Sequence, residues 1–150
     1  QVAAGADVIA ISDPSGTGEI LGPKYFEEFA VTYINRLLEG LPKEKMGTIV
    51  HICGQMQPVY REVDKIRSNA LSFDSIVSMK EAKKRLPGRV LMGNVSTYAL
   101  EFGTPERVGI LTKSCIEAGS DILSPACGLG MRSPLANVKA ILAALEQKGV

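Results

Sequence analysis

Cysteine and net charge are both scarce in this sequence, and each scarcity excludes a class of protein. Three cysteines among 150 residues are odd in number and far apart, so we expect no disulfide framework. The 17 basic and 16 acidic residues give a net charge of +1, which predicts no nucleic-acid partner and no anionic membrane surface. No apolar run reaches the roughly 18 residues of a membrane span, and no signal-like start is visible. We therefore expect a globular protein of the cytoplasm.

Five short apolar runs alternate with five helical patterns along the chain. With 45% hydrophobic residues, the sequence can fill the core of one domain. Continuous apolar runs are typical of a parallel sheet that is covered on both faces, so the predicted class is α/β. The expected strands span 7–12, 48–53, 70–74, 89–94 and 121–123, and the expected helices begin near residues 23, 57, 78, 104 and 133. The second helix is expected to reach about residue 67, and the last to end near 148–149.

Doubly wound sheets and (β/α)8 barrels share this alternation, and the loops favour the barrel. The loop after the first strand has no Gly-x-Gly-x-x-Gly, and residues 54–56 do not form a Walker loop. An Ala-Gly-small-Asp sequence at 4–7 returns at 118–121, where a whole helix precedes it. A barrel typically has about 250 residues. We therefore expect 1–150 to be one partial domain, the C-terminal five β/α units of a TIM barrel, in a fragment of a longer chain whose N-terminal units are missing.

The stretch around the single histidine carries the main chemical signal. His51 and Cys53 are two residues apart on an expected strand, so their side chains point to the same side. Cys127 follows another expected strand and precedes glycines at 128 and 130. Strand ends of a barrel meet at one mouth, so the sequence predicts a zinc site formed by His51, Cys53 and Cys127. Two buried thiols beside an unrelated imidazole are the alternative interpretation.

Other polar side chains also fall at expected strand ends. Asp13 and Asn94 are predicted to bind substrate, although Asp13 also suits an ordinary turn and Asn94 also suits a loop contact. Asp74 is a further strand-end polar group. Cys115 lies on the apolar face of a helix, where a cysteine behaves as a small hydrophobic residue, so we exclude it from the site.

Three protein ligands leave the fourth position of a zinc ion open, which is typical of a catalytic site. Two thiolates and a neutral imidazole cancel the charge of Zn²⁺, so such a site suits a substrate thiol. A thiol bound to zinc loses its proton at neutral pH and keeps a nucleophilic sulfur, which favours alkyl transfer.

Four segments resemble the uroporphyrinogen decarboxylase superfamily, and more narrowly its methylcobamide:coenzyme M methyltransferase branch. They are HICG at 51–54, GNV at 93–95, DILSPACGLG at 121–130 and PLANVKAILAA at 134–144. The resemblance covers essentially all 150 residues as the C-terminal part of a longer chain. It implies a TIM barrel, zinc held by His51, Cys53 and Cys127, and a zinc-bound thiolate that takes a methyl group from a methylated corrinoid. It also implies a corrinoid protein and a small thiol such as coenzyme M as partners.

Two other functions stay open at this point. A metal-free decarboxylase of the same superfamily would share the barrel and need no His-x-Cys pair. A non-catalytic docking half, with the catalytic half supplied elsewhere, would bind a corrinoid protein without activity. The sequence leaves open the methyl donor, the thiol acceptor and whether the protein forms a homo-oligomer.

Overall fold

A four-stranded parallel sheet in the order β1-β2-β3-β4 forms the centre of the protein, for which the computed structural model describes residues 1–146. Each strand is hydrogen-bonded to the next one along the chain, and every pairing is parallel. This arrangement confirms the predicted α/β class. The strands are β1 (Val8–Asp13), β2 (Gly47–Ile52), β3 (Ala70–Phe73) and β4 (Val90–Met92).

Helices follow every strand, so the chain repeats a strand-helix unit. The α-helices are α1 (Gly18–Tyr25), α2 (Thr32–Glu39), α3 (Tyr60–Val63), α4 (Met79–Arg85), α5 (Thr97–Phe102), α6 (Pro105–Glu117) and α7 (Leu135–Glu146). A 3₁₀ turn η1 (Val2–Ala4) precedes β1, a π-helical segment η2 (Phe26–Val31) joins α1 to α2, and a 3₁₀ turn η3 (Gln57–Val59) leads into α3. None of the helices within residues 1–146 has the length and apolar character that crossing a membrane requires.

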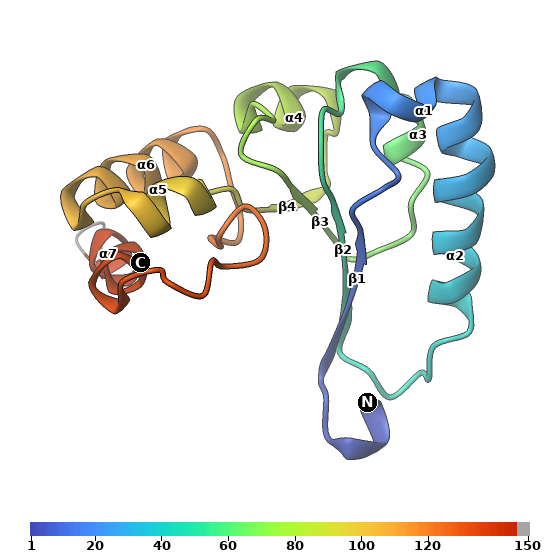
Figure 1. Cartoon of the computed structure of the whole chain (residues 1–150). Coiled ribbons are helices and arrows are strands. Elements are labelled where there is room, and N and C mark those ends of the chain that lie inside the picture. Colours follow the sequence, from blue (N-terminus) through green and yellow to red (C-terminus); the bar gives the residue numbers. More distant parts are fainter. Residues whose placement is uncertain (147–150) are drawn as a thin grey trace.

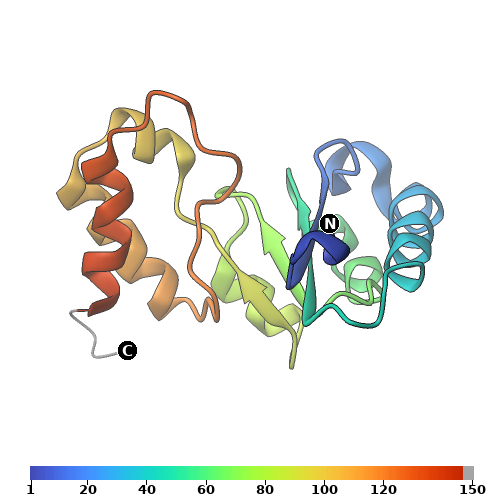
Figure 2. The ribbon, with the colours of Figure 1, turned by 90° about the horizontal axis from the view of Figure 1, so that it is seen from below.

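Two groups of helices flank the strands, and α4 contributes Met79 and Ala82 to the larger of the two apolar cores. Figures 1 and 2 show α1, α2 and α3 beside β1 and β2, whereas α5, α6 and α7 cluster beyond β4. Two apolar cores match these groups. The larger core includes Val50, Ile52 and Phe73 of the strands, and the smaller one joins Val95 to Cys115 and other residues of α5–α7. The second group therefore has a core of its own.

Local capping explains where several helices begin. Ser78 Oγ accepts a hydrogen bond from the Glu81 N–H, as the Ser-x-x-Glu pattern predicts, and Thr104 Oγ1 caps α6 in the same way. Pro23 begins the continuous part of the first helix, because Gly22 interrupts the preceding turn with a φ of 64°. Helix α5 was not predicted from the sequence. Its N-cap is Ser96, whose Oγ accepts from the Ala99 N–H.

The helix that was expected to run from about residue 57 to 67 corresponds to η3 and α3, and it is shorter than predicted. It ends at Val63 and does not reach residue 67. The guanidinium of Arg89 donates to the carbonyls of Asp64, Ile66 and Ser68. After Val63 the chain tightens into turns in which the Lys65 N–H donates to Glu62 and the Ile66 N–H donates to Val63, and Arg89 binds the carbonyls that these turns leave free of helical bonds.

The fifth expected strand is also incomplete. Residues 121–125 follow β4 through two isolated parallel bridges, Met92 to Ile122 and Val95 to Pro125, without forming a regular strand. The Leu91 N–H donates to the carboxylate of Asp121 instead of to a backbone carbonyl. The last helix is described to Glu146, so its predicted end near 148–149 lies outside the described residues.

Candidate metal centre

Strand β2 places two of the three predicted ligands. Val50 and Ile52 are fully buried under the helices, and the alternate residues of the strand point to the opposite face of the sheet. His51 lies on that opposite face, and Cys53 follows at the carboxyl end of the strand. Both side chains are half-buried.

Cys127 reaches the same place from the other end of the sequence. The Ala126 N–H donates to the carbonyl of Val95 at 2.8 Å, which fixes the segment before Cys127 beside the chain that leaves β4. Cys127 itself is exposed. The parallel path of residues 121–125 along β4 therefore brings the third predicted ligand to the carboxyl ends of the strands, where Cys53 lies.

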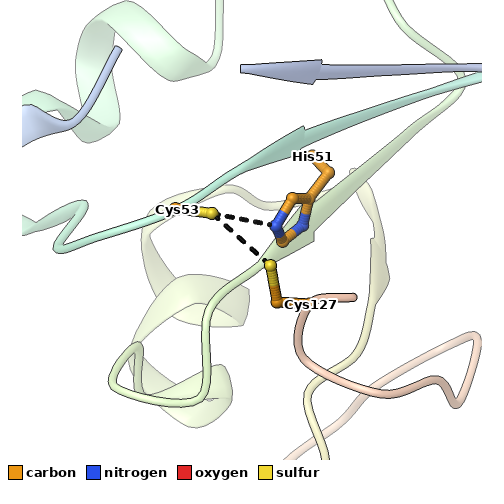
Figure 3. A group of neighbouring side chains, drawn as sticks. All are labelled: His51, Cys53 and Cys127. Atoms are coloured by element: carbon orange, nitrogen blue, oxygen red, sulfur yellow. Dashed lines mark hydrogen bonds between the residues drawn. The ribbon is translucent and has the colours of Figure 1, made fainter. Parts of the chain in front are cut away.

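The three ligand atoms converge, as Figure 3 shows. Cys53 Sγ lies 3.3 Å from His51 Nε2 and 3.7 Å from Cys127 Sγ. All three ligand atoms lie within 4.8 Å of one another. Within residues 1–146, this is the one group of three or more His, Cys, Asp or Glu side chains whose ligand atoms lie close enough together to hold a metal ion.

The spacing suits a tetrahedral zinc ion. Zinc bonds of about 2.3 Å to sulfur and about 2.0–2.1 Å to nitrogen place two sulfur ligands about 3.8 Å apart, and a sulfur and a nitrogen about 3.6 Å apart. The separations of 3.7 Å and 3.3 Å are close to these values. A disulfide would bring the sulfurs to about 2.05 Å, so the two thiols are separate. The donor set of one imidazole and two thiols therefore fits the metal.

The surroundings of His51 favour the neutral form of its imidazole. Burial lowers the pKa of His51, and the negative charge of Asp74 and hydrogen bonding to Ser72 offset only part of that effect. A neutral imidazole keeps a lone pair on one nitrogen, which is the form that binds a metal.

The thiol of Cys53 is protonated at neutral pH. Its pKa is raised to about 11, first by burial, then by the hydrogen bond and charge of Cys127, and further by the charges of Asp74 and Asp13. A divalent cation would reverse this effect, because a coordinating thiol loses its proton. The negative charges around the site therefore favour a cation there.

The other predicted site residues have local roles. Asp13 Oδ1 accepts hydrogen bonds from the N–H groups of Ser15 and Gly16, which is ordinary turn chemistry, while its charge reaches the thiol of Cys53. The amide nitrogen of Asn94 donates to the carbonyls of Asp74 and Val77, at 2.8 Å each. Their contact with substrate stays a prediction.

Cys115 is buried on α6, as expected. Its thiol lies 3.7 Å from Asn94 Oδ1, away from the cluster of His51, Cys53 and Cys127. Burial raises the pKa of this thiol, which the bond to Asn94 offsets in part. The exclusion of Cys115 from the predicted ligand set agrees with this position.

Two contacts at the site were not predicted from the sequence. Ser72 Oγ lies 3.0 Å from His51 Nδ1, and Glu19 Oε2 accepts from the Gln55 N–H at 2.8 Å. Ser72 is a polar residue in the otherwise apolar run of β3, which is a signal that the sequence does contain. Glu19 carried no such signal, because an exposed glutamate at the start of a helix is ordinary.

Comparisons with known proteins show which proteins this chain is similar to. The chain is 33% identical over 136 residues to the methylcobamide:CoM methyltransferase MtbA of Methanosarcina acetivorans, covering 90% of this chain and 40% of that protein. It is also 33% identical over 150 residues to the methylcobamide:CoM methyltransferase MtaA of Methanosarcina barkeri, covering 98% of this chain and 43% of the relative. The uroporphyrinogen decarboxylase of Neisseria meningitidis matches over fewer residues, 112 at 33% identity, covering 72% of this chain and 31% of that enzyme.

A solved structure of a methyltransferase is also similar to this chain. A methyltransferase from Methanosarcina mazei superposes with a TM-score of 0.90 at 32% identity, over 99% of this chain and 44% of that one. The present chain thus spans less than half the length of these relatives. Residues 1–147 match the uroporphyrinogen decarboxylase (URO-D) family, and the chain belongs to that family.

Proposed function

We propose that the protein is a zinc-dependent methyltransferase that moves a methyl group from a methylated, protein-bound corrinoid to a thiol such as coenzyme M. The observation that carries this proposal is the convergence of His51 Nε2 and the two sulfurs of Cys53 and Cys127. The relatives named as methylcobamide:CoM methyltransferases support the choice of donor and acceptor.

The three side chains would hold the zinc ion through one nitrogen and two sulfurs. His51 offers a neutral imidazole, and Cys53 and Cys127 offer sulfur once their protons are displaced. When bound, zinc supplies the positive charge that favours the deprotonated form of a substrate thiol. The exposure of Cys127 leaves the site open on the side where a substrate would approach.

Asp13 and Asn94 belong to the proposal as substrate-binding residues. The carboxylate of Asp13 lies at the carboxyl end of β1, beside the end of β2 that carries the ligands. Asn94 follows β4, and its amide bonds the loop that begins at Asp74. We propose that Asp13 borders the substrate directly and that Asn94 acts through this loop.

The test compares zinc content and methyl transfer in the purified, freshly reduced protein. Wild type should carry about one zinc per chain and should form methylated coenzyme M from methylcobalamin, while Cys127→Ala should lose both. Cys115→Ala is the matched control, because it removes a cysteine that lies outside the cluster. Reduced wild type without zinc would overturn the proposal and favour a metal-free decarboxylase.

A further inference from the structure

The imidazole of His51 has two nitrogens, and the sheet gives each a different neighbour. Nε2 faces Cys53 Sγ at 3.3 Å, and Nδ1 faces Ser72 Oγ at 3.0 Å. The register pairs His51 with Ser72 on β3, so both side chains project from the same face of the sheet. Ser72 is only 4% exposed, so water does not readily replace it.

A neutral imidazole carries one proton, and its position decides which nitrogen can bind a metal. Nε2 is the nitrogen that points toward the sulfurs, so it must keep its lone pair. The proton must then lie on Nδ1, where it needs an acceptor. The hydroxyl oxygen of Ser72 is in place to accept it.

Strand β1 offers a second serine at the same level. Ser12 pairs with His51 in the sheet register, on the opposite side from Ser72. No hydrogen bond joins Ser12 to the imidazole among the contacts of residues 1–146, and Ser12 is exposed. The two serines thus share residue type, level and sheet face, and differ in the contact with His51.

We propose that Ser72 is a positioning residue that accepts a hydrogen bond from His51 Nδ1–H, and so keeps Nε2 unprotonated and aimed at the metal site. This inference rests on the proposed function for its purpose, but the proton position is a property of the metal-free protein. In this role Ser72 is not one of the three ligands and acts on the metal site through His51.

The first test reads the tautomer directly. His51 is the only histidine in the chain, so its ring nitrogens give unambiguous signals in ¹⁵N NMR. In the metal-free wild type at pH 7.5, Nδ1 should be protonated and Nε2 unprotonated. Ser72→Ala should shift the proton toward Nε2, whereas Ser12→Ala should leave it on Nδ1. A wild-type proton on Nε2 would overturn the inference even if Ser72→Ala failed to fold.

The second test reads metal affinity by competition with a zinc chelator. Ser72→Ala should weaken zinc binding about 10–100-fold, while Ser12→Ala should keep the wild-type affinity and Ser72→Thr, which retains the hydroxyl, should recover most of it. Wild-type affinity and tautomer in a folded Ser72→Ala variant would refute the role of Ser72 and leave the proposed function intact. If wild type bound no zinc, the proposed function would fail, and the NMR result alone would decide the role of Ser72.

Discussion

The sulfur atoms of Cys53 and Cys127 lie 3.7 Å apart, although 74 residues separate them in the chain. Neither local sequence nor one secondary-structure element brings them together. The parallel path of residues 121–125 beside β4 does so, because it ends at the same edge of the sheet as β2. The proximity is thus a property of the fold, and it has a chemical consequence.

Mild oxidation should join these two cysteines. The sulfurs need to approach by about 1.7 Å to reach disulfide length, so diamide should form a Cys53–Cys127 bond in the reduced protein. Bound zinc should suppress the reaction because it occupies both sulfurs. Peptide mapping by mass spectrometry without reductant would identify the bond.

Cys115 provides the internal control for this experiment. It is 9% exposed and lies on α6, so it should stay a free thiol throughout. The Cys115→Ala variant should form the same disulfide at the same rate. A crosslink that includes Cys115 would contradict the arrangement of the three thiols.

The backbone after Cys53 should tolerate no side chain at residue 54. Gly54 has a φ of +80°, and a Cβ there would lie 2.8 Å from Thr17 Cβ and 2.7 Å from Glu19 Oε1. Gly88 has a φ of +79° with nothing within 4 Å, so it isolates the backbone effect from the steric one.

Gly88→Ala should lower the free energy of unfolding by about 1–2 kcal/mol, the cost of a left-handed alanine. Gly54→Ala should lower it by roughly a further 1–3 kcal/mol because Thr17 must move. Urea denaturation would measure both values. Gly54→Ala should also weaken zinc binding by displacing Cys53, and equal unfolding energies for the two variants would contradict the close contact.

The sequence predicted the parts of this structure that depend on local pattern. Alternation along β2 placed His51 and Cys53 on one face, and the serine and threonine caps placed the starts of α4 and α6. Its errors came from contacts between distant residues. The side chain of Arg89 binds carbonyls of the loop that follows α3, and the carboxylate of Asp121 accepts the N–H of Leu91 in β4. The contact between Ser72 and His51 depends on the register of two strands, which a local pattern does not specify.

Asn94 offers a test that separates structure from substrate binding. Its amide nitrogen donates to the carbonyls of Asp74 and Val77, and the residue is 8% exposed. Asn94→Ala removes both bonds, although the Asp74 carbonyl keeps the hydrogen bond from the Val77 N–H, and should lower the free energy of unfolding by about 1–3 kcal/mol. Thermal and urea denaturation would measure the loss.

Asn137 is a suitable comparison, because its amide also donates to two carbonyls, those of Leu100 and Gly103, away from the site. Asn137→Ala should destabilise the protein to a similar degree without a specific effect on the thiol substrate. A KM for the thiol that rises in Asn94→Ala and not in Asn137→Ala, at a temperature where both are folded, would support a substrate role for Asn94. Equal KM values would assign Asn94 to the loop alone.

The carboxylate of Asp121 should make the stability of the protein depend on pH in acid. Asp121 Oδ2 accepts from the Leu91 N–H at 2.8 Å and lies 2.5 Å from Lys83 Nζ. Burial acts to raise the pKa of this carboxyl, but the bond from Leu91 and the bond and charge of Lys83 together outweigh it, so the pKa is lowered. A carboxyl whose pKa is lower in the folded state stabilises that state above the pKa of the unfolded chain, about 3.9.

This contribution should therefore be complete at neutral pH and should be lost as the pH falls below about 4 and through the lowered folded pKa. Asp121→Asn should lower the free energy of unfolding by about 1 kcal/mol at pH 7, since the side chain is 40% exposed and its ion pair is screened by solvent. Urea denaturation from pH 7 to pH 3 would show the difference between wild type and variant shrinking as the pH falls. A difference that stays constant over this range would mean that the charge of Asp121 does not stabilise the link between β4 and the segment that carries Cys127.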